Sequence, residues 1–179
     1  MNETLEAALN YIQHGLSPFP LKPSTKYPNV RHWKPYRDTT ASLRKCNEWW
    51  GNGSNNDIAI VTQGLLVLDP DGEEGMKSVH GLYIPETPTV ITGDGLHHYF
   101  KDPGFDVKNC QHIIPSVDIR AYDGYAKAPP SKHESGELYR WKPGYSLDDI
   151  PLAYAPLWLI ELIRISQKHE IYTNHSCPN

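Results

Sequence analysis

The chain has 179 residues, which suits one domain with a sizeable core, and its formal net charge of −4 excludes a protein whose whole surface grips nucleic acid. Its three cysteines are widely spaced and form no Cys-x-x-Cys pair, which excludes a disulfide framework and a zinc knuckle and fits a reducing compartment. No apolar run reaches the ~20 residues of a membrane span and no signal-peptide pattern is present, so we expect a soluble, cytoplasmic protein without a membrane partner.

Two helices are expected in the first 51 residues. Apolar residues at helical spacing predict an amphipathic helix over residues 4–14, which ends before Gly15. An extended segment follows at residues 17–21. The second helix is expected to take Thr40 as its N-cap and to run to Trp50, where a glycine follows.

The segment from Pro20 to Lys45, which extends into the second of these helices, is strongly basic. It contains one acid, Asp38, and seven cations: Lys22, Lys26, Arg31, Lys34, Arg37, Arg44 and Lys45. A local basic patch can bind phosphates even when the net charge of the protein is acidic. A solvated surface loop would have the same composition, so charge counting leaves both interpretations open.

The stretch at residues 65–72 is an apolar run that ends in two acids one residue apart. We expect it to pair as a hairpin with a strand at residues 57–62, through a turn at Gly64. Successive strand side chains point to opposite faces, so Asp69 and Asp71 share a face. Two close carboxylates repel, and Mg²⁺ or Mn²⁺ would offset that repulsion. The alternative is turn chemistry, in which both acids cap backbone amides.

Residues 96–100 are expected to form a strand that contains two adjacent histidines. A short helix at residues 73–80 and an extended segment at residues 89–92 precede it. Alternation puts His98 on the same face as two apolar residues, where a core histidine is the usual outcome. The opposite face carries His97 and Tyr99, so His97 is the histidine that we expect at a functional site.

A third acid lies in the predicted strand at residues 115–120. Val117 and Ile119 form its apolar face, and Asp118 and Arg120 lie together on the other face. A solvated surface face is the alternative interpretation.

The last part of the chain contains a predicted strand at residues 139–141 and a predicted helix at residues 156–165. This helix is apolar on nearly all sides but too short to span a membrane. We expect it to pack into the core or against a following domain.

Several motifs occur together in a fixed order. They are Gly15 with Phe19-Pro20-Leu21 and Lys26-Tyr27-Pro28; Trp49-Trp50 before Asn56-x-Ile58-x-Ile60-x-Thr62; Asp69-x-Asp71; Thr92-Gly93-x-Gly95-x-His97-x-Tyr99-Phe100; Asp118-x-Arg120; and Ala128-Pro129-Pro130-Ser131-x-His133-x-Ser135-Gly136 with Tyr139-x-Trp141. This combination resembles the bifunctional primase-polymerase domain of the archaeo-eukaryotic primase superfamily, found at the N-termini of plasmid and viral replication proteins. One departure is Lys127, where the family usually has an aliphatic residue.

The resemblance implies a role for each matching residue. The catalytic, metal-binding residues would be Asp69, Asp71 and Asp118. The nucleotide-binding residues would be His97, Arg120, Ser131 and His133. The basic segment supplies our candidates for contacts with template phosphates, which are Lys22, Lys26 and Lys34.

The resemblance also implies an α+β fold, in which an α/β module packs on an RRM-like mixed sheet that carries the acids. The catalytic domain would span residues 1–150. Residues 151–179 would form a C-terminal helix and tail, a candidate linker to a missing domain.

The implied activity is template-directed nucleotidyl transfer, as a DNA primase or DNA polymerase in replication, with two Mg²⁺ or Mn²⁺ ions held by the acids. The implied partners are single-stranded DNA template, primer and nucleoside triphosphates, with a helicase or a helical initiation module in a longer protein of a prokaryotic plasmid or virus. Two other classes fit the same acids. They are a metal-dependent phosphohydrolase or nuclease, and a non-catalytic DNA-binding module of a replication protein.

Overall fold

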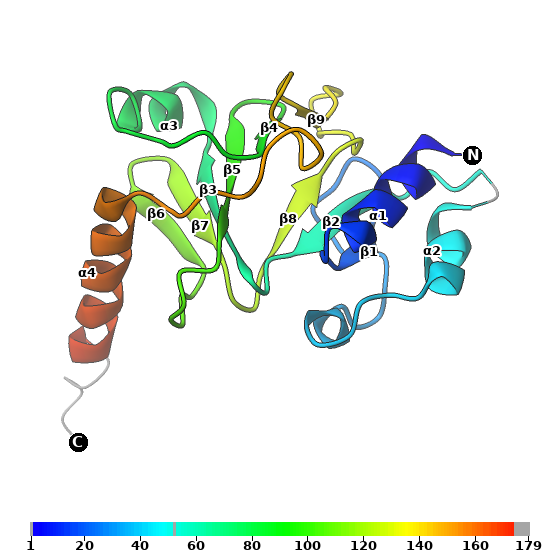
Figure 1. The fold of residues 1–179 in the computed structure, drawn as a ribbon, viewed down its shortest axis with the longest axis horizontal. Helices are drawn as coiled ribbons and strands as arrows, with labels where there is room; N and C mark the ends of the chain where they lie inside the picture. The colour runs from blue at the N-terminus through cyan, green and yellow to red at the C-terminus, as the bar shows by residue number, and fades with distance from the viewer. Residues whose placement is uncertain (1, 52, 174–179) are drawn as a thin grey trace.

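The computed structural model describes residues 2–51 and 53–173, with side chains described as far as residue 168. Two sheets lie side by side, with helices α1 and α2 at one end of the molecule and helix α4 at the other (Figure 1). The elements are, in chain order, α1 (Glu3–Gln13), β1 (Pro18–Leu21), the 3₁₀ helix η1 (Lys34–Arg37), α2 (Leu43–Trp50), β2 (Asp57–Val61), β3 (Leu65–Pro70), α3 (Gly72–Ser78), β4 (Thr89–Ile91), β5 (Leu96–Lys101), β6 (Cys110–Ile114), β7 (Val117–Arg120), β8 (Tyr125–Ala128), β9 (Arg140–Trp141) and α4 (Leu157–Thr173). The α+β fold class is confirmed.

The strands form a small sheet with the order β1-β2-β8 and a large sheet with the order β6-β7-β3-β5-β4-β9. Every pairing between these strands is antiparallel. The sheet that carries the acids is therefore antiparallel, and the expectation of a mixed sheet is wrong in this detail.

The expected hairpin of β2 with β3 is also wrong, because the two strands belong to different sheets. Strand β2 pairs with β1 on one edge and with β8 on the other, and β3 pairs with β5 and β7. Both strands are thus central strands whose two edges are already hydrogen-bonded. The turn at Gly64, where φ is +77°, carries the chain from one sheet to the other.

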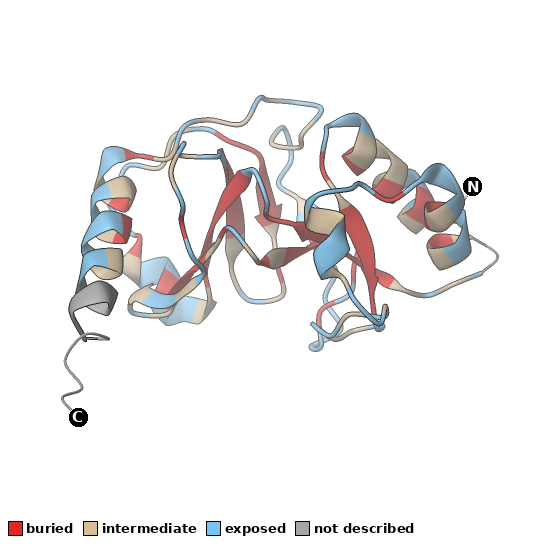
Figure 2. Ribbon diagram, turned by 90° about the horizontal axis from the view of Figure 1, so that it is seen from below, coloured by how far each residue is buried: buried red, intermediate tan, exposed pale blue. Residues whose placement is uncertain are grey.

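Apolar clusters pack on both faces of each sheet. Ile60 of the small sheet and Tyr99 of the large sheet share one cluster with α1 and α2. The next residue, Phe100, lies on the opposite face of the large sheet and packs in a second cluster with Leu159 of α4. On the other face of the small sheet, Phe19 packs under the basic segment. Figure 2 accordingly shows buried strands and helices that are exposed on their outer sides.

Local capping explains where the first two helices begin and end. Helix α1 starts after Asn2, whose side chain accepts a hydrogen bond from the Thr4 amide at 3.0 Å. The N-cap of α2 is Ser42, whose hydroxyl accepts from the amide of the third helical residue at 3.3 Å, so the expectation of Thr40 is wrong. Gly51 follows Trp50 and closes α2 as expected.

The segment after residue 150 packs against the large sheet as far as the structure describes its side chains. Ala153 bridges to Phe100 of β5, and Leu159 and Ile163 of α4 are buried in the cluster on the outer face of that sheet. The prediction that this helix packs into the core is confirmed. The domain boundary at residue 150 and the link to a further domain stay predictions, and residues 174–179 lie outside the described residues. None of the described helices has the length and apolar character that a membrane crossing requires.

Candidate active site

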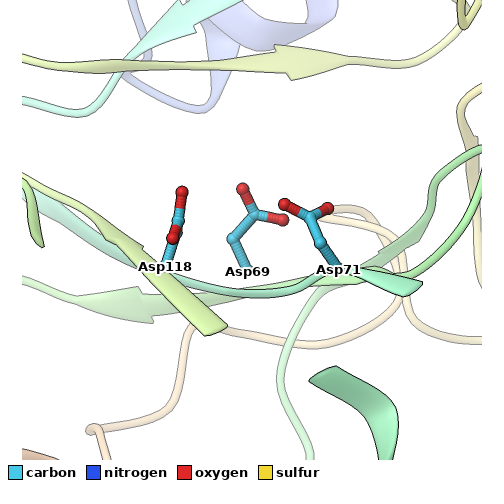
Figure 3. A group of neighbouring side chains, drawn as sticks. All are labelled: Asp69, Asp71 and Asp118. Atoms are coloured by element: carbon cyan, nitrogen blue, oxygen red, sulfur yellow. The ribbon is translucent and has the colours of Figure 1, made fainter. Parts of the chain in front are cut away.

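The three acids converge because of where β3 and β7 pair. Asp69 and Asp118 are direct partners across these two strands, and Asp71 follows β3 as the residue before helix α3. Directly opposite residues of an antiparallel pair have close Cβ atoms, so the two strand carboxylates must be neighbours. The Asp71 side chain makes no capping hydrogen bond to α3, which argues against the turn interpretation. All three carboxylates point away from the strands in the same direction (Figure 3).

Two positively charged or protonatable groups hold the strand carboxylates. The Arg120 Nη2 donates to Asp118 Oδ2 at 2.8 Å and to Asp69 Oδ2 at 3.4 Å. The His97 Nε2 lies 3.1 Å from Asp69 Oδ1. The backbone amide of His112, on β6, donates to Asp118 Oδ1 at 2.9 Å. These contacts offset the repulsion between the acids.

The electrostatic environments of Asp69 and Asp71 differ. Burial by itself would raise the pKa of Asp69, but His97, Arg120 and Lys26 lower this pKa to about 2. Burial, followed by the neighbouring Asp69 carboxylate, raises the pKa of Asp71 to about 6. At neutral pH both groups are ionised, and Asp71 is the one that takes up a proton first on acidification.

The three acids have the chemistry and the spacing of a metal site. One carboxylate oxygen from each of Asp69, Asp71 and Asp118 lies within 4.8 Å of the others. The Oδ1 of Asp69 is buried, and its polar neighbour is the His97 Nε2 at 3.1 Å. Carboxylate oxygens are the ligands that Mg²⁺ and Mn²⁺ prefer. The cluster therefore fits a hard divalent cation.

The acids face a cavity of about 230 Å³ that lies between the two sheets. The large sheet supplies Asp69, His97 and Arg120, and the small sheet supplies Leu21, Tyr125, Ala126 and Lys127. The remaining lining residues come from the loops and are Lys26, Asp71, Asn109, Asp123, Gly124 and Tyr139. Asp118 stands directly beside Asp69 on the neighbouring strand.

The two adjacent histidines lie as the alternation predicted. His97 faces the cavity on the same face as Tyr99, and their ring centroids are 6.3 Å apart. His98 is buried and its Nδ1 lies 3.1 Å from the Thr89 hydroxyl on β4. Burial lowers the pKa of His98 to about 4, as expected for a neutral core histidine.

The other two candidates for nucleotide contacts lie further from the acids. The Ser131 hydroxyl accepts from the Ile58 amide at 2.8 Å and donates to the Ile58 carbonyl at 3.2 Å, so it ties a loop to β2 and does not line the cavity. His133 is buried beside Tyr139, whose ring lies between His133 and His97 with centroid distances of 5.9 and 5.7 Å. The contact of Ser131 with the nucleotide stays a prediction.

The three lysines predicted to contact the template have different surroundings. Lys26 lines the cavity, whereas Lys22 is exposed and does not line it. The Nζ of Lys34 pairs with Asp123 Oδ2 at 2.9 Å, and Arg37 pairs with the other oxygen of this acid at 2.8 Å. The basic segment is thus partly neutralised by the protein itself.

Five further residues with polar side chains line the cavity, and none of them is among the predicted site residues. They are Asn109, Asp123, Tyr125, Lys127 and Tyr139. Two of these residues could have been recognised in the sequence, since Lys127 departs from the family pattern and Tyr139 belongs to the Tyr-x-Trp motif. Asn109 could not, because its side chain supports a turn by accepting from the Ala121 amide, and such a contact leaves no recognisable sequence motif.

Comparison with known families agrees with this geometry. The sequence profile of the bifunctional DNA primase/polymerase N-terminal domain matches residues 8–158. Comparison with curated proteins gave no match. The matched range contains all three acids, His97 and both sheets. The chain therefore belongs to the bifunctional DNA primase/polymerase N-terminal family.

Proposed function

We propose that the chain adds nucleotides to a primer on a DNA template, with Asp69, Asp71 and Asp118 as the catalytic acids. The observation that carries this proposal is the convergence of these carboxylates within 4.8 Å, with Asp69 and Asp71 lining a cavity that cationic side chains also line. Acids alone would repel a nucleoside triphosphate, and cations alone would bind it without activating it. Both together suit phosphoryl transfer.

The three acids would hold Mg²⁺ or Mn²⁺, which when bound stabilises the attacking and leaving oxygens of an in-line displacement. The chain's own residues then have separate tasks. Arg120 keeps Asp69 and Asp118 side by side, through its contacts at 3.4 and 2.8 Å. His97, in contact with Asp69, offers a ring nitrogen to the phosphates of the incoming nucleotide.

The proposed partners are single-stranded DNA, a primer and nucleoside triphosphates. Lys22 is exposed on the loop after β1 and Lys34 is exposed on η1, and both are proposed contacts for template phosphates. His133 is proposed as a secondary contact for the nucleotide, beyond Tyr139. A helicase or helical module in a longer protein stays a proposal from family resemblance.

The test is primer extension on a DNA template with Mg²⁺ or Mn²⁺, using Asp69→Asn and Asp118→Asn. Both substitutions keep the size of the side chain while removing a ligand charge. We expect extension to fall by more than about 100-fold, the upper end of the cost of disturbing a metal's supporting groups. The control is Asp102→Asn, an exposed acid outside the cavity whose carboxylate accepts from the Gly104 amide in a turn, and it should extend as the wild type does.

Each contrary outcome points to a different activity. Metal-dependent hydrolysis of DNA or nucleotides without template dependence would make the chain a phosphohydrolase or nuclease. DNA binding that survives Asp69→Asn, in a wild type that incorporates no nucleotide, would make it a binding module. Thermal unfolding of each variant separates loss of activity from loss of fold.

A further inference from the structure

Three cations line the cavity, and they differ in their partners. Arg120 is held by Asp69 and Asp118, and Lys127 is held by Asp57 with its Nζ 2.7 Å from Oδ2. Lys26 is exposed, and among the residues that the structure describes it forms no ion pair. It is therefore the cavity cation whose charge is available to an incoming anion.

Lys26 sits in a closed loop that follows β1. The Lys22 amide donates to the Tyr27 carbonyl at 2.9 Å, and Leu21 bridges to Pro28, so residues 22–27 form a tight reversal. Ser24 has φ +57°, a conformation that costs free energy in a residue with a side chain. Such a loop keeps one conformation only if neighbouring groups hold it.

Two side chains of β8 hold the backbone of this loop next to Lys26. The Tyr125 hydroxyl donates to the Lys26 carbonyl at 2.9 Å, and Lys127 Nζ donates to the Thr25 carbonyl at 3.0 Å. Tyr125 and Lys127 are two residues apart on a strand, so both point to the face of the small sheet that borders the cavity.

The Asp57–Lys127 pair forms the base of this arrangement. Both side chains are buried, and Asp57 also accepts from the Ser24 amide at 2.7 Å and from the Lys132 amide at 3.0 Å. Burying an ion pair is costly, and an apolar pair of similar volume is often at least as stable. Stability alone therefore does not explain why both of these buried residues are charged. Their hydrogen bonds to the loop that carries Lys26 do explain it.

We propose that Lys26 binds the triphosphate of the incoming nucleotide and that the Asp57–Lys127 pair is the positioning device that aims it. The inference rests on the proposed function and deepens it by naming the substrate contact. A lysine ammonium is a compact point charge that binds phosphate well. Lys26 lines the same cavity as Asp69 and Asp71. Lys26 therefore belongs to the nucleotide site, and the expectation that it binds the template is replaced.

The first experiment measures binding of a nucleoside triphosphate in Mg²⁺ by titration calorimetry. We expect Lys26→Ala to weaken triphosphate affinity by about 10- to 100-fold, the size of a charged hydrogen bond. Lys26→Arg should retain most of the affinity, and binding of the nucleoside monophosphate should change much less. The matched control is Lys101→Ala, an exposed lysine at the end of β5, which should bind as the wild type does.

A second measurement separates nucleotide from template. The affinity of the Lys26→Ala protein for labelled single-stranded DNA, and its dependence on salt, should equal those of the wild type without nucleotide. If Lys26→Ala instead weakens DNA binding and leaves triphosphate affinity unchanged, Lys26 contacts the template and the proposal is overturned.

The positioning role is tested with the double variant Asp57→Asn with Lys127→Met, which leaves no buried charge unpaired. We expect its nucleotide KM to rise in primer extension, with kcat changed less. If the pair acts through Lys26, adding Lys26→Ala to this variant should weaken triphosphate affinity little further. If the losses of triphosphate affinity from Lys26→Ala and from the double variant add fully, the positioning role is overturned, because independent defects add.

Triphosphate binding and primer extension by the wild type, measured side by side, distinguish this inference from the proposed function. Triphosphate binding that depends on Lys26, without any primer extension, would overturn the proposed function and support the inference. A wild type that binds no triphosphate in Mg²⁺ would overturn the inference.

Discussion

Asp69 and Asp71 are two residues apart and share a face, yet their environments shift their pKa values in opposite directions. Asp69 is buried between His97 and Arg120, and the pKa of Asp69 is held at about 2. Asp71 lies beyond the strand end and forms no ion pair with the residues that the structure describes, and burial together with the Asp69 charge raises the pKa of Asp71 to about 6. Of these two acids, Asp71 is therefore the one that takes up a proton at mildly acidic pH.

A metal-binding experiment tests this difference. Below about pH 6 Asp71 gains a proton and becomes a poor ligand, so affinity for Mn²⁺ should fall by up to about tenfold per pH unit. Calorimetric titration with Mn²⁺ at about pH 5 and about pH 7.5 measures the change. Asp71→Asn should bind more weakly at both values and lose most of the pH dependence. Equal wild-type affinities at the two pH values would contradict the prediction.

At the scale of a strand, β5 separates two adjacent histidines into two roles. His97 faces the cavity, whereas His98 is buried between β3 and β4, opposite Leu68 and Thr89 in register. The first lines the cavity, where we propose that it contacts the nucleotide, and the second is packed in the core. The distinction follows from the alternation of side chains along a strand.

We expect His98→Ala to lower the free energy of unfolding by about 1–3 kcal/mol, because it removes a buried side chain and its hydrogen bond. His97→Ala should instead raise the nucleotide KM with a smaller effect on stability. Urea unfolding and primer-extension kinetics measure the two effects. Loss of activity in a fully stable His98→Ala protein, with His97→Ala silent, would contradict the assignment.

The pH dependence of stability provides a check on His98. The folded pKa of about 4 lies below the ordinary value of 6.5, so folding favours the neutral ring. This contribution is fully present above pH 6.5 and is lost by up to about 1.4 kcal/mol per pH unit as the pH falls towards 4. The His98→Ala protein should lack that part of the loss.

At the scale of the molecule, the site exists only because two sheets meet. The large sheet carries the acids, and the small sheet with its loops carries Lys26 and its supports. Helix α4 covers the opposite face of the large sheet, so it lies away from the cavity. The proposed catalytic acids and the proposed nucleotide contact thus come from different layers, while α4 packs on the far face of the large sheet.

We expect the chain to extend a primer better than it starts a new strand. Initiation must hold two nucleotides and a template together without the contacts that a duplex end contributes. The family resemblance implies that a helical initiation module of a longer protein would supply those contacts. The measurement compares dinucleotide formation on unprimed single-stranded DNA with extension of a primer, in the same metal and salt. Efficient unprimed synthesis by these 179 residues would refute the expectation.

The sequence by itself determined the features that depend on local periodicity. Helix α1, the faces of His97 and His98, and the shared face of the acids all follow from repeats of 3.6 or two residues. The ordered motifs also indicated the family, which the profile match to residues 8–158 confirms.

Only the tertiary structure decided which strands are partners and which side chains meet across the cavity. Periodicity assigns a residue to a face but does not name the strand opposite, so β2 and β3 looked like a hairpin although each pairs elsewhere. For the same reason the sequence grouped Lys26 with other basic residues and did not indicate that Ser131 lies against β2. Their positions, beside the acids and against Ile58, depend on contacts between residues far apart in the chain.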